Sequence, residues 1–338
     1  MHRRVAWPAL ALMAAACGGD DPPARYIEDF AARAGEAACE PVQHPDAERE
    51  VTDLAPAGDT AILALFGTER EVVLYDGTLR PLLRLGFEAA GPRGLELPVS
   101  AAILRDRIHV VDEAGNAVKV FDLNGAYVSQ VHTSFPPRHA RVVGGDVLLA
   151  PIQYGSEPAR LVYRIDGDSL TEVDGARPVR LPDAGWEALA NMIRIVDLRA
   201  GAWGYVHGLF LPRAKLFRRD VARDIALPVP ASLRPRIEAR PTLPIREETA
   251  AEIPVIAFAV ASESGSGDVL LLTTTGRPTS TGADGYRQRA LLRLDRDLEF
   301  RKGYLVGPRA TAMVPVPGGA GEVLLVDDTG AWFRCRVD

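Results

Sequence analysis

Histidines and nearby aromatic residues are the side chains of this sequence with the clearest potential for chemistry, yet they form no standard site. His132 and His139 flank a short loop and could share a site, but their spacing matches no metal-ligand motif. His207 lies in an aromatic-rich segment that begins at Trp203, whereas His109 stands between two aliphatic residues of an expected strand. A packed or solvated histidine is the commoner interpretation of such positions. We therefore predict no metal ligand and treat His139, Trp203 and His207 as candidate ligand-contacting residues.

Motifs for nucleophilic, phosphate and dinucleotide chemistry are absent from the sequence. It contains no Gly-x-Ser-x-Gly elbow, no phosphate-binding loop, no Gly-x-Gly-x-x-Gly fingerprint and no calcium loop. No Ser/His/Asp set can be chosen without free choice among many candidates. We therefore predict no catalytic residue and no cofactor.

The three cysteines divide into one near the start of the chain and a pair far apart. A basic start (Met1–Arg4) and a short apolar run lead to Ala-Ala-Ala-Cys17, followed by a polar, glycine-rich stretch, which is typical of a bacterial lipoprotein signal. The alternative is an ordinary secretory signal with a coincidental cysteine. We expect a signal peptide over 1–16, a lipid on Cys17 and, because Gly18 rather than Asp follows it, an outer-membrane address.

Composition limits the partners of the remaining chain. The 338 residues carry a formal net charge of −6 without a long basic run, which argues against a nucleic-acid partner. No later apolar stretch is long enough to span a bilayer, so membrane attachment is expected through the N-terminal lipid alone. Aliphatic content is high enough for a substantial core.

The elements that would position any site are predicted to be almost entirely β-strands. One short amphipathic helix is expected within residues 25–38, because Ile27, Phe30 and Ala34 have helical spacing. From about Val51 the chain consists of short apolar runs bounded by turn residues, in groups of four whose first strands begin near residues 51, 99, 140, 193, 255 and 311. A period of 40–60 residues with four strands per unit predicts a six-bladed β-propeller over residues 39–338. The competing fold is a pair of β-sandwiches.

The last unit has only three strands, so we expect an N-terminal strand near residues 39–43 to complete it. That strand would bring Cys39 beside Cys335, and a disulfide there would close the ring. The alternative is two unrelated buried thiols. Two segments, 228–253 and 273–285, depart from a compact blade and are expected to form long loops.

Residues 91–131 carry a resemblance to a known family. The run Gly91–Val99, with Ile108–Asp112 and Asn116–Gly125 after it, is similar to the core of NHL repeats. This resemblance implies a six-bladed propeller of the kind found in bacterial lipoproteins, and it implies little about activity. We expect a binding or scaffold module for an envelope protein, peptide or glycan. The alternative is a metal-dependent hydrolase or lyase with its site at the channel mouth.

Overall fold

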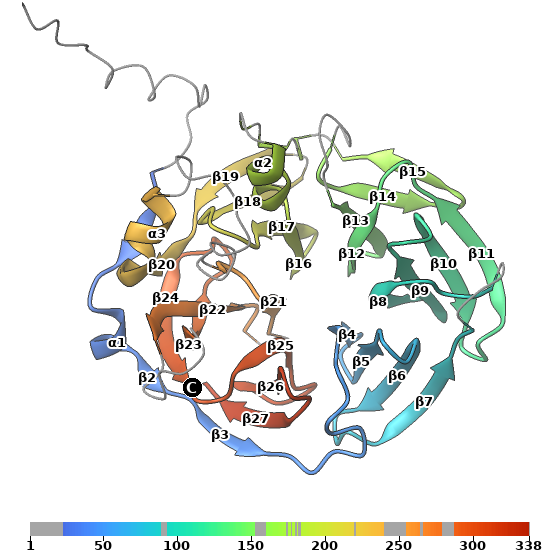
Figure 1. The fold of residues 1–338 in the computed structure, drawn as a ribbon, viewed down its shortest axis with the longest axis horizontal. Coiled ribbons are helices and arrows are strands. Elements are labelled where there is room, and N and C mark those ends of the chain that lie inside the picture. Colours follow the sequence, from blue (N-terminus) through green and yellow to red (C-terminus); the bar gives the residue numbers. More distant parts are fainter. Residues whose placement is uncertain are drawn as a thin grey trace, which may run out of the picture.

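A computed structural model of the protein shows the predicted β-propeller. The structure describes residues 23–88, 93–152, 160–173, 175–176, 178–179, 181, 184–219, 221–239, 255–263, 266–278 and 287–337. Six antiparallel sheets surround a central channel like the blades of a wheel (Figure 1). The competing pair of β-sandwiches is therefore wrong.

Each blade follows the chain from its innermost to its outermost strand. Blade one contains β4 (Asp53–Ala57), β5 (Ala61–Phe66), β6 (Glu71–Asp76) and β7 (Pro81–Gly86). Blade two contains β8 (Pro98–Leu104), β9 (Arg107–Asp112), β10 (Ala117–Asp122) and β11 (Tyr127–His132). Blade three contains β12 (Pro137–Val143), β13 (Asp146–Pro151), β14 (Tyr163–Asp166) and β15 (Ser169–Glu172). Blade four contains β16 (Ile193–Arg199), β17 (Ala202–His207), β18 (Arg213–Arg218) and β19 (Val221–Ala226). Blade five contains β21 (Ala259–Ser262), β22 (Val269–Pro278), β23 (Arg287–Leu294) and β24 (Phe300–Val306). Blade six contains β25 (Ala310–Pro315), β26 (Glu322–Asp327) and β27 (Trp332–Arg336).

The apolar runs are continuous because both faces of a blade are buried against neighbouring blades. In β5, Ile62 and Phe66 pack toward blade six, whereas Leu63 and Leu65 pack toward blade two. Successive side chains of a strand point to opposite faces, so one run of six apolar residues serves two interfaces. Six such clusters, one per interface, make up the core.

An aspartate recurs at the ends of strands, just before a turn, and its hydrogen bonds give a physical reason for this repetition. Asp76, Asp122 and Asp327 each accept backbone N–H bonds from the residues two and four positions later. An aspartate that satisfies its own turn in this way fixes a tight hairpin. In the NHL-like stretch, buried Asp112 accepts the N–H groups of Glu96 and Leu97 and thereby ties the loop before blade two to the sheet.

The N-terminal segment closes the ring and runs along its outer edge, with less helix than predicted. The short helix expected within 25–38 is present but spans only α1 (Phe30–Arg33), and the strands β1 (Arg25–Ile27) and β2 (Gly35–Glu36) flank it. Both Ile27 and Phe30 are buried: Ile27 reaches the core from the paired strand β1, and Phe30 from α1. We call residues 25–41 the belt.

Three blades lie along the belt in chain order (Figure 1). The strand β1 pairs with β20 (Pro228–Pro230), which follows blade four, and β2 extends blade five through β24. The strand β3 (Ala38–Pro41) then supplies the missing outer strand of blade six, where Cys39 pairs in register with Cys335. A disulfide joins these two residues, so the predicted closure is confirmed.

Long connections between blade strands contain further structure. Segment 228–253 begins with β20, a 3₁₀ turn over Ala231–Leu233 and α3 (Arg234–Ala239), and its remainder lies outside the described residues. Segment 273–285 is not a loop from its start, because β22 continues to Pro278. A helix absent from the prediction, α2 (Ala184–Ala190), connects blades three and four. No helix within the described residues has the length and apolarity needed to cross a membrane.

Candidate functional site

The central channel is lined by one equivalent position on the innermost strand of successive blades. In the first four blades this position holds Asp53, Ser100, His139 and Arg194. Each of the first three side chains accepts a hydrogen bond from a backbone N–H of the next blade. The donor is the residue directly after the one that holds this position in that blade. These bonds are Ala101 N to Asp53 Oδ2 (3.2 Å), Ala140 N to Ser100 Oγ (3.1 Å) and Ile195 N to His139 Nδ1 (3.3 Å). Polar side chains therefore join blades one to four along the channel.

Asp53 is the centre of this network. Arg141, on blade three, donates from Nη2 to Asp53 Oδ1 at 2.6 Å and from Nη1 to Oδ2 at 2.8 Å. Ser100 donates to the same carboxylate at 2.6 Å. A two-pronged arginine–carboxylate pair with both side chains largely shielded from solvent is strong and geometrically fixed. The charges of Asp53 and Arg141 therefore offset one another.

His139 is a neutral imidazole in the channel wall. Because its Nδ1 accepts the Ile195 N–H, its ring hydrogen lies on Nε2. Burial, together with the positive charges of Arg141, Arg194 and Arg138, holds the pKa of His139 well below its usual range. No described residue accepts the Nε2 hydrogen.

Arg194 breaks the series, because a guanidinium has donors and no acceptor. It therefore cannot accept the backbone N–H that the fifth blade would offer at this position. Burial lowers the pKa of Arg194 to about 10, and the carboxylate of Asp53 partly opposes that shift. Its side chain retains partial exposure where it lines the channel cavity, and no residue of the described part of the chain accepts a hydrogen bond from it.

The channel side chains are not arranged as a metal site. Within the part of the chain that the structure describes, no three of the His, Cys, Asp and Glu side chains are grouped so that they could hold a metal ion. The cavity lining contains one carboxylate, Asp53, and one imidazole, His139. It also contains two arginines, whose positive charge disfavours a bound cation. The metal-dependent alternative thus gains no support from the geometry.

His207, the third candidate, has a structural role. It is buried at the end of β17, and its Nδ1–H donates to the carbonyl oxygen of Ala190, the last residue of α2. Burial lowers the pKa of His207 to about 4, so the ring is neutral. Its hydrogen bond to Ala190 holds α2 against blade four. The channel cavity is lined by His139 but not by Trp203 or His207.

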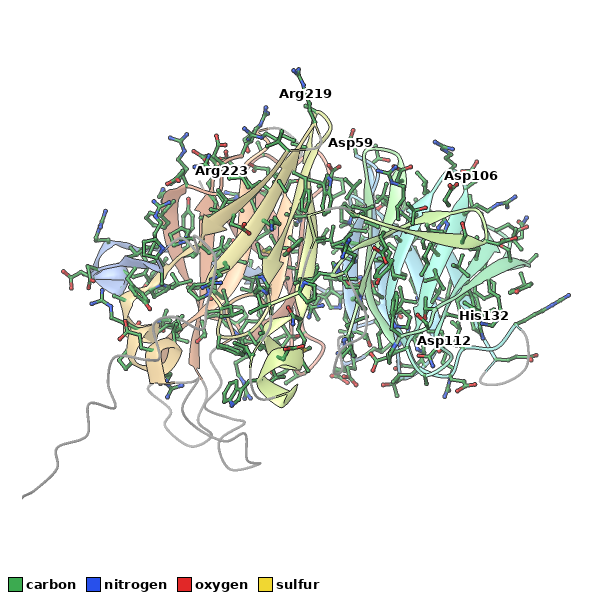
Figure 2. All side chains as sticks on the ribbon, turned by 90° about the horizontal axis from the view of Figure 1, so that it is seen from above. Asp59, Asp106, Asp112, His132, Arg219 and Arg223 are labelled. Carbon is green, nitrogen blue, oxygen red and sulfur yellow. A yellow bond between two sulfur atoms is a disulfide. The ribbon has the colours of Figure 1, made fainter. Side chains whose placement is uncertain are left out.

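Trp203 lies instead in a separate groove between blades three and four, with a volume of about 540 Å³. Its ring stacks flat on Phe217, with centroids 4.1 Å apart and planes 3° from parallel. Gly144, Gly201 and Arg219 come from turns between strands, so the groove reaches the face of the propeller on which Arg219 projects in Figure 2. Connecting helices such as α2 lie on the opposite face, the side of Asp112 and His132 (Figure 2).

Charged side chains surround the aromatic centre of the groove. Asp146 and Arg164 form an ion pair at 3.1 Å with both side chains about half exposed. Glu172 and Arg219 complete a set of two acidic and two basic residues. This balance favours neither a strongly acidic nor a strongly basic ligand. The volume falls within the range of about 300–1,000 Å³ that is common for small-ligand sites.

Comparison with known proteins supports the fold and does not identify a family. No family model matches this chain, so the NHL resemblance stays a prediction. No curated protein matches it either. A member of the DUF4221 family from Bacteroides vulgatus has a TM-score of 0.61 at 8% identity, with 90% of this chain and 96% of that chain covered.

Two further solved structures have the same overall arrangement. A Bacteroides fragilis protein assigned as exported has a TM-score of 0.55 at 9% identity and covers 94% of this chain and 100% of its own. Virginiamycin B lyase from Staphylococcus aureus, solved with quinupristin, has a TM-score of 0.53 at 9% identity, with 90% and 100% covered. At these identities the likeness shows the fold alone: the chain is a six-bladed β-propeller.

Sequence reasoning did not find Asp53, Ser100, Arg141 or Arg194. The one usable signal was position: each lies on an expected first strand, where a polar or charged residue interrupts an otherwise apolar element. The alignment of Asp53, Ser100, His139 and Arg194 at one height becomes visible only when the blades are arranged in a ring.

Proposed function

We propose that this protein is a lipid-anchored binding module outside the cytoplasm, and that its groove between blades three and four takes a neutral glycan. The observation that carries the proposal is Trp203, an aromatic side chain held flat by Phe217 in a groove of about 540 Å³. A preformed aromatic surface contributes contact area at little cost in conformational entropy.

The chemistry of the groove matches a sugar chain better than a charged ligand. Sugar rings present an apolar face of C–H groups, which suits a flat indole, and a rim of hydroxyl groups that both donate and accept. Around Trp203 the groove offers carboxylate acceptors on Asp146 and Glu172 and guanidinium donors on Arg164 and Arg219. An apolar centre with a few polar groups at its edge is the usual composition of a ligand site.

Two observations support a location outside the cytoplasm. A disulfide such as Cys39–Cys335, in which Cys335 is buried, is of a kind that persists in oxidising compartments. The sequence ending at Cys17 matches a lipoprotein signal, although Cys17 lies outside the described residues. A lipid on Cys17 would hold the propeller at a membrane surface, where envelope polysaccharides are within reach.

The test is a screen of the purified protein against an array of neutral envelope oligosaccharides, followed by fluorescence titration. Trp203 is one of four tryptophans, so a ligand that covers it should change the emission, and Trp203→Phe should remove that change. Trp203→Ala should weaken glycan binding at least tenfold, because it removes the stacking surface. Asp146→Asn should weaken it less.

Tyr127→Ala is the matched control, because Tyr127 is a partly exposed aromatic residue on blade two, away from the groove. It should leave glycan affinity unchanged. Unfolding of each variant is measured in parallel, since Trp203→Ala also removes packing against Phe217. Binding of peptides in place of oligosaccharides, or equal glycan affinity in the wild type and Trp203→Ala, would contradict the proposal.

A further inference from the structure

We propose that the central channel is a second binding site, separate from the groove, and that it holds a carboxylate group between Arg194 and His139. The structure brings two hydrogen-bond donors without described acceptors to one cavity. One is the guanidinium of Arg194. The other is the Nε2–H of His139, which carries the ring hydrogen because Nδ1 accepts the Ile195 N–H.

The fold fixes the imidazole and places it next to the arginine in the chain of contacts. His139 is 2% exposed and is held by the Ile195 N–H, so its ring cannot turn without losing that bond. Ile195 directly follows Arg194 on β16, so the bond that fixes the imidazole also sets its position relative to the arginine. A ligand that accepts from both groups would join blades three and four, continuing the series of bonds that begins at Asp53.

The charges that face this cavity leave one positive charge unopposed. Asp53 is neutralised by Arg141, and Arg138 pairs with Glu113 outside the cavity lining. His139 is neutral, because burial and the nearby arginines hold its pKa well below its usual range. Arg194 is thus the remaining charge, which favours an anion carrying a single negative charge.

The size of the cavity selects a small group. Its volume is about 40 Å³. On this measure one water takes roughly 10–15 Å³, so the cavity accepts about three or four heavy atoms. A carboxylate contains three heavy atoms, and its two oxygens match the planar fork of a guanidinium.

The experiment uses acetate as the probe. Binding of ¹³C-labelled acetate to the purified protein is measured by NMR line broadening at pH 7.5, with chloride keeping the ionic strength constant. The wild type is expected to bind one acetate per chain. Arg194→Gln should weaken acetate binding at least tenfold, and Arg194→Lys should weaken it less, because the charge remains while the fork is lost.

Arg223→Gln is the matched control, since Arg223 is an exposed strand arginine of the same blade (Figure 2). It should bind acetate like the wild type. Arg194→Gln should not lower the denaturation midpoint measured without acetate, because no described residue accepts a hydrogen bond from Arg194. Unchanged acetate affinity in Arg194→Gln, or chloride competing with acetate at equal concentration, would overturn the proposal.

Discussion

Two halves of this propeller hold their blades together in different ways. Blades one to four are joined from inside, where Asp53, Ser100 and His139 each accept a backbone N–H of the next blade. Blades four to six are joined from outside, where the belt pairs successively with β20, β24 and β27. The first half depends on side chains spread through the sequence, whereas the second depends on one continuous segment.

The difference follows from where the chain leaves the ring open. Within blades one to five, consecutive strands pair in chain order, and each connection costs little loop entropy. Blade six must instead recruit β3 from the other end of the sequence, 296 residues from its bonding partner. Order across that distance is entropically expensive, so the belt is fixed by backbone pairing, buried Phe30 and a covalent bond.

Removal of the disulfide is the largest expected perturbation. Replacing both Cys39 and Cys335 by Ala should lower the free energy of unfolding by about 5–6 kcal/mol on the chain-entropy model, because a very long loop is released. Chemical denaturation gives the magnitude. Hydrogen exchange gives the location: β3 and β27 should lose protection before blades two and three.

Wild-type protein in a reducing agent is the matched comparison for the double variant. The two samples should have the same denaturation midpoint. If protection falls equally in all six blades, the belt is not a separate outer closure, and the contrast between the two halves fails.

Loss of Asp53 is expected to be the next largest effect, and it should open the other half of the ring. Asp53→Ala leaves the guanidinium of Arg141 shielded from solvent without its carboxylate and removes the acceptor of Ser100 and of the Ala101 N–H. Breaking one partner of such a pair costs about 3 kcal/mol. Denaturant unfolding measures the loss, and hydrogen exchange should place it at β4, β8 and β12.

Arg141→Met and the double variant Asp53→Ala/Arg141→Met complete a double-mutant cycle. Removing both charges should cost less than the sum of the single losses, because neither partner is left unpaired. Additive losses would show that the pair is not the link between blades one and three.

The strands and the closure could be predicted because their signals are local. Runs such as Ala61–Phe66 are apolar on both faces, turns such as Asp76–Gly77 are encoded by adjacent residues, and three cysteines with one assigned to lipid leave a single pair. The short helix within 25–38 was predicted from the same kind of periodicity, and it is present but limited to α1 (Phe30–Arg33). Ile27 and Phe30 do face the core, but the belt gains more by pairing its backbone with blade edges than by forming an isolated helix.

The candidate sites depend on contacts between blades, which the sequence does not display. Asp53 and Arg141 are 88 positions apart, and nothing near either residue indicates the other. Trp203 was recognisable as an aromatic candidate, but its groove needs Asp146 and Arg164 from a different blade. His207 attracted attention through its aromatic neighbours, yet its role is set by Ala190, which belongs to a helix that the sequence pattern did not reveal.

The smallest predicted effect tests how closely the belt packs against blade five. Gly303, on β24, faces the ring of Phe30, and a Cβ added there would overlap that ring. Gly303→Ala should therefore cost about 1–3 kcal/mol through overpacking, with the belt around α1 losing hydrogen-exchange protection while the channel half stays unchanged. Gly307→Ala is the matched control, because a Cβ at Gly307 meets nothing within 4 Å.

Both variants reduce the freedom of the unfolded chain equally, so the difference between them isolates the contact with Phe30. Gly303→Ala in a Phe30→Ala background should recover most of the loss, since the overlapping ring is gone. Equal stability of Gly303→Ala and Gly307→Ala would mean that α1 moves freely over blade five. The contact of the belt with blade five would then depend on the backbone pairing of β2 with β24 and not on the packing of Phe30.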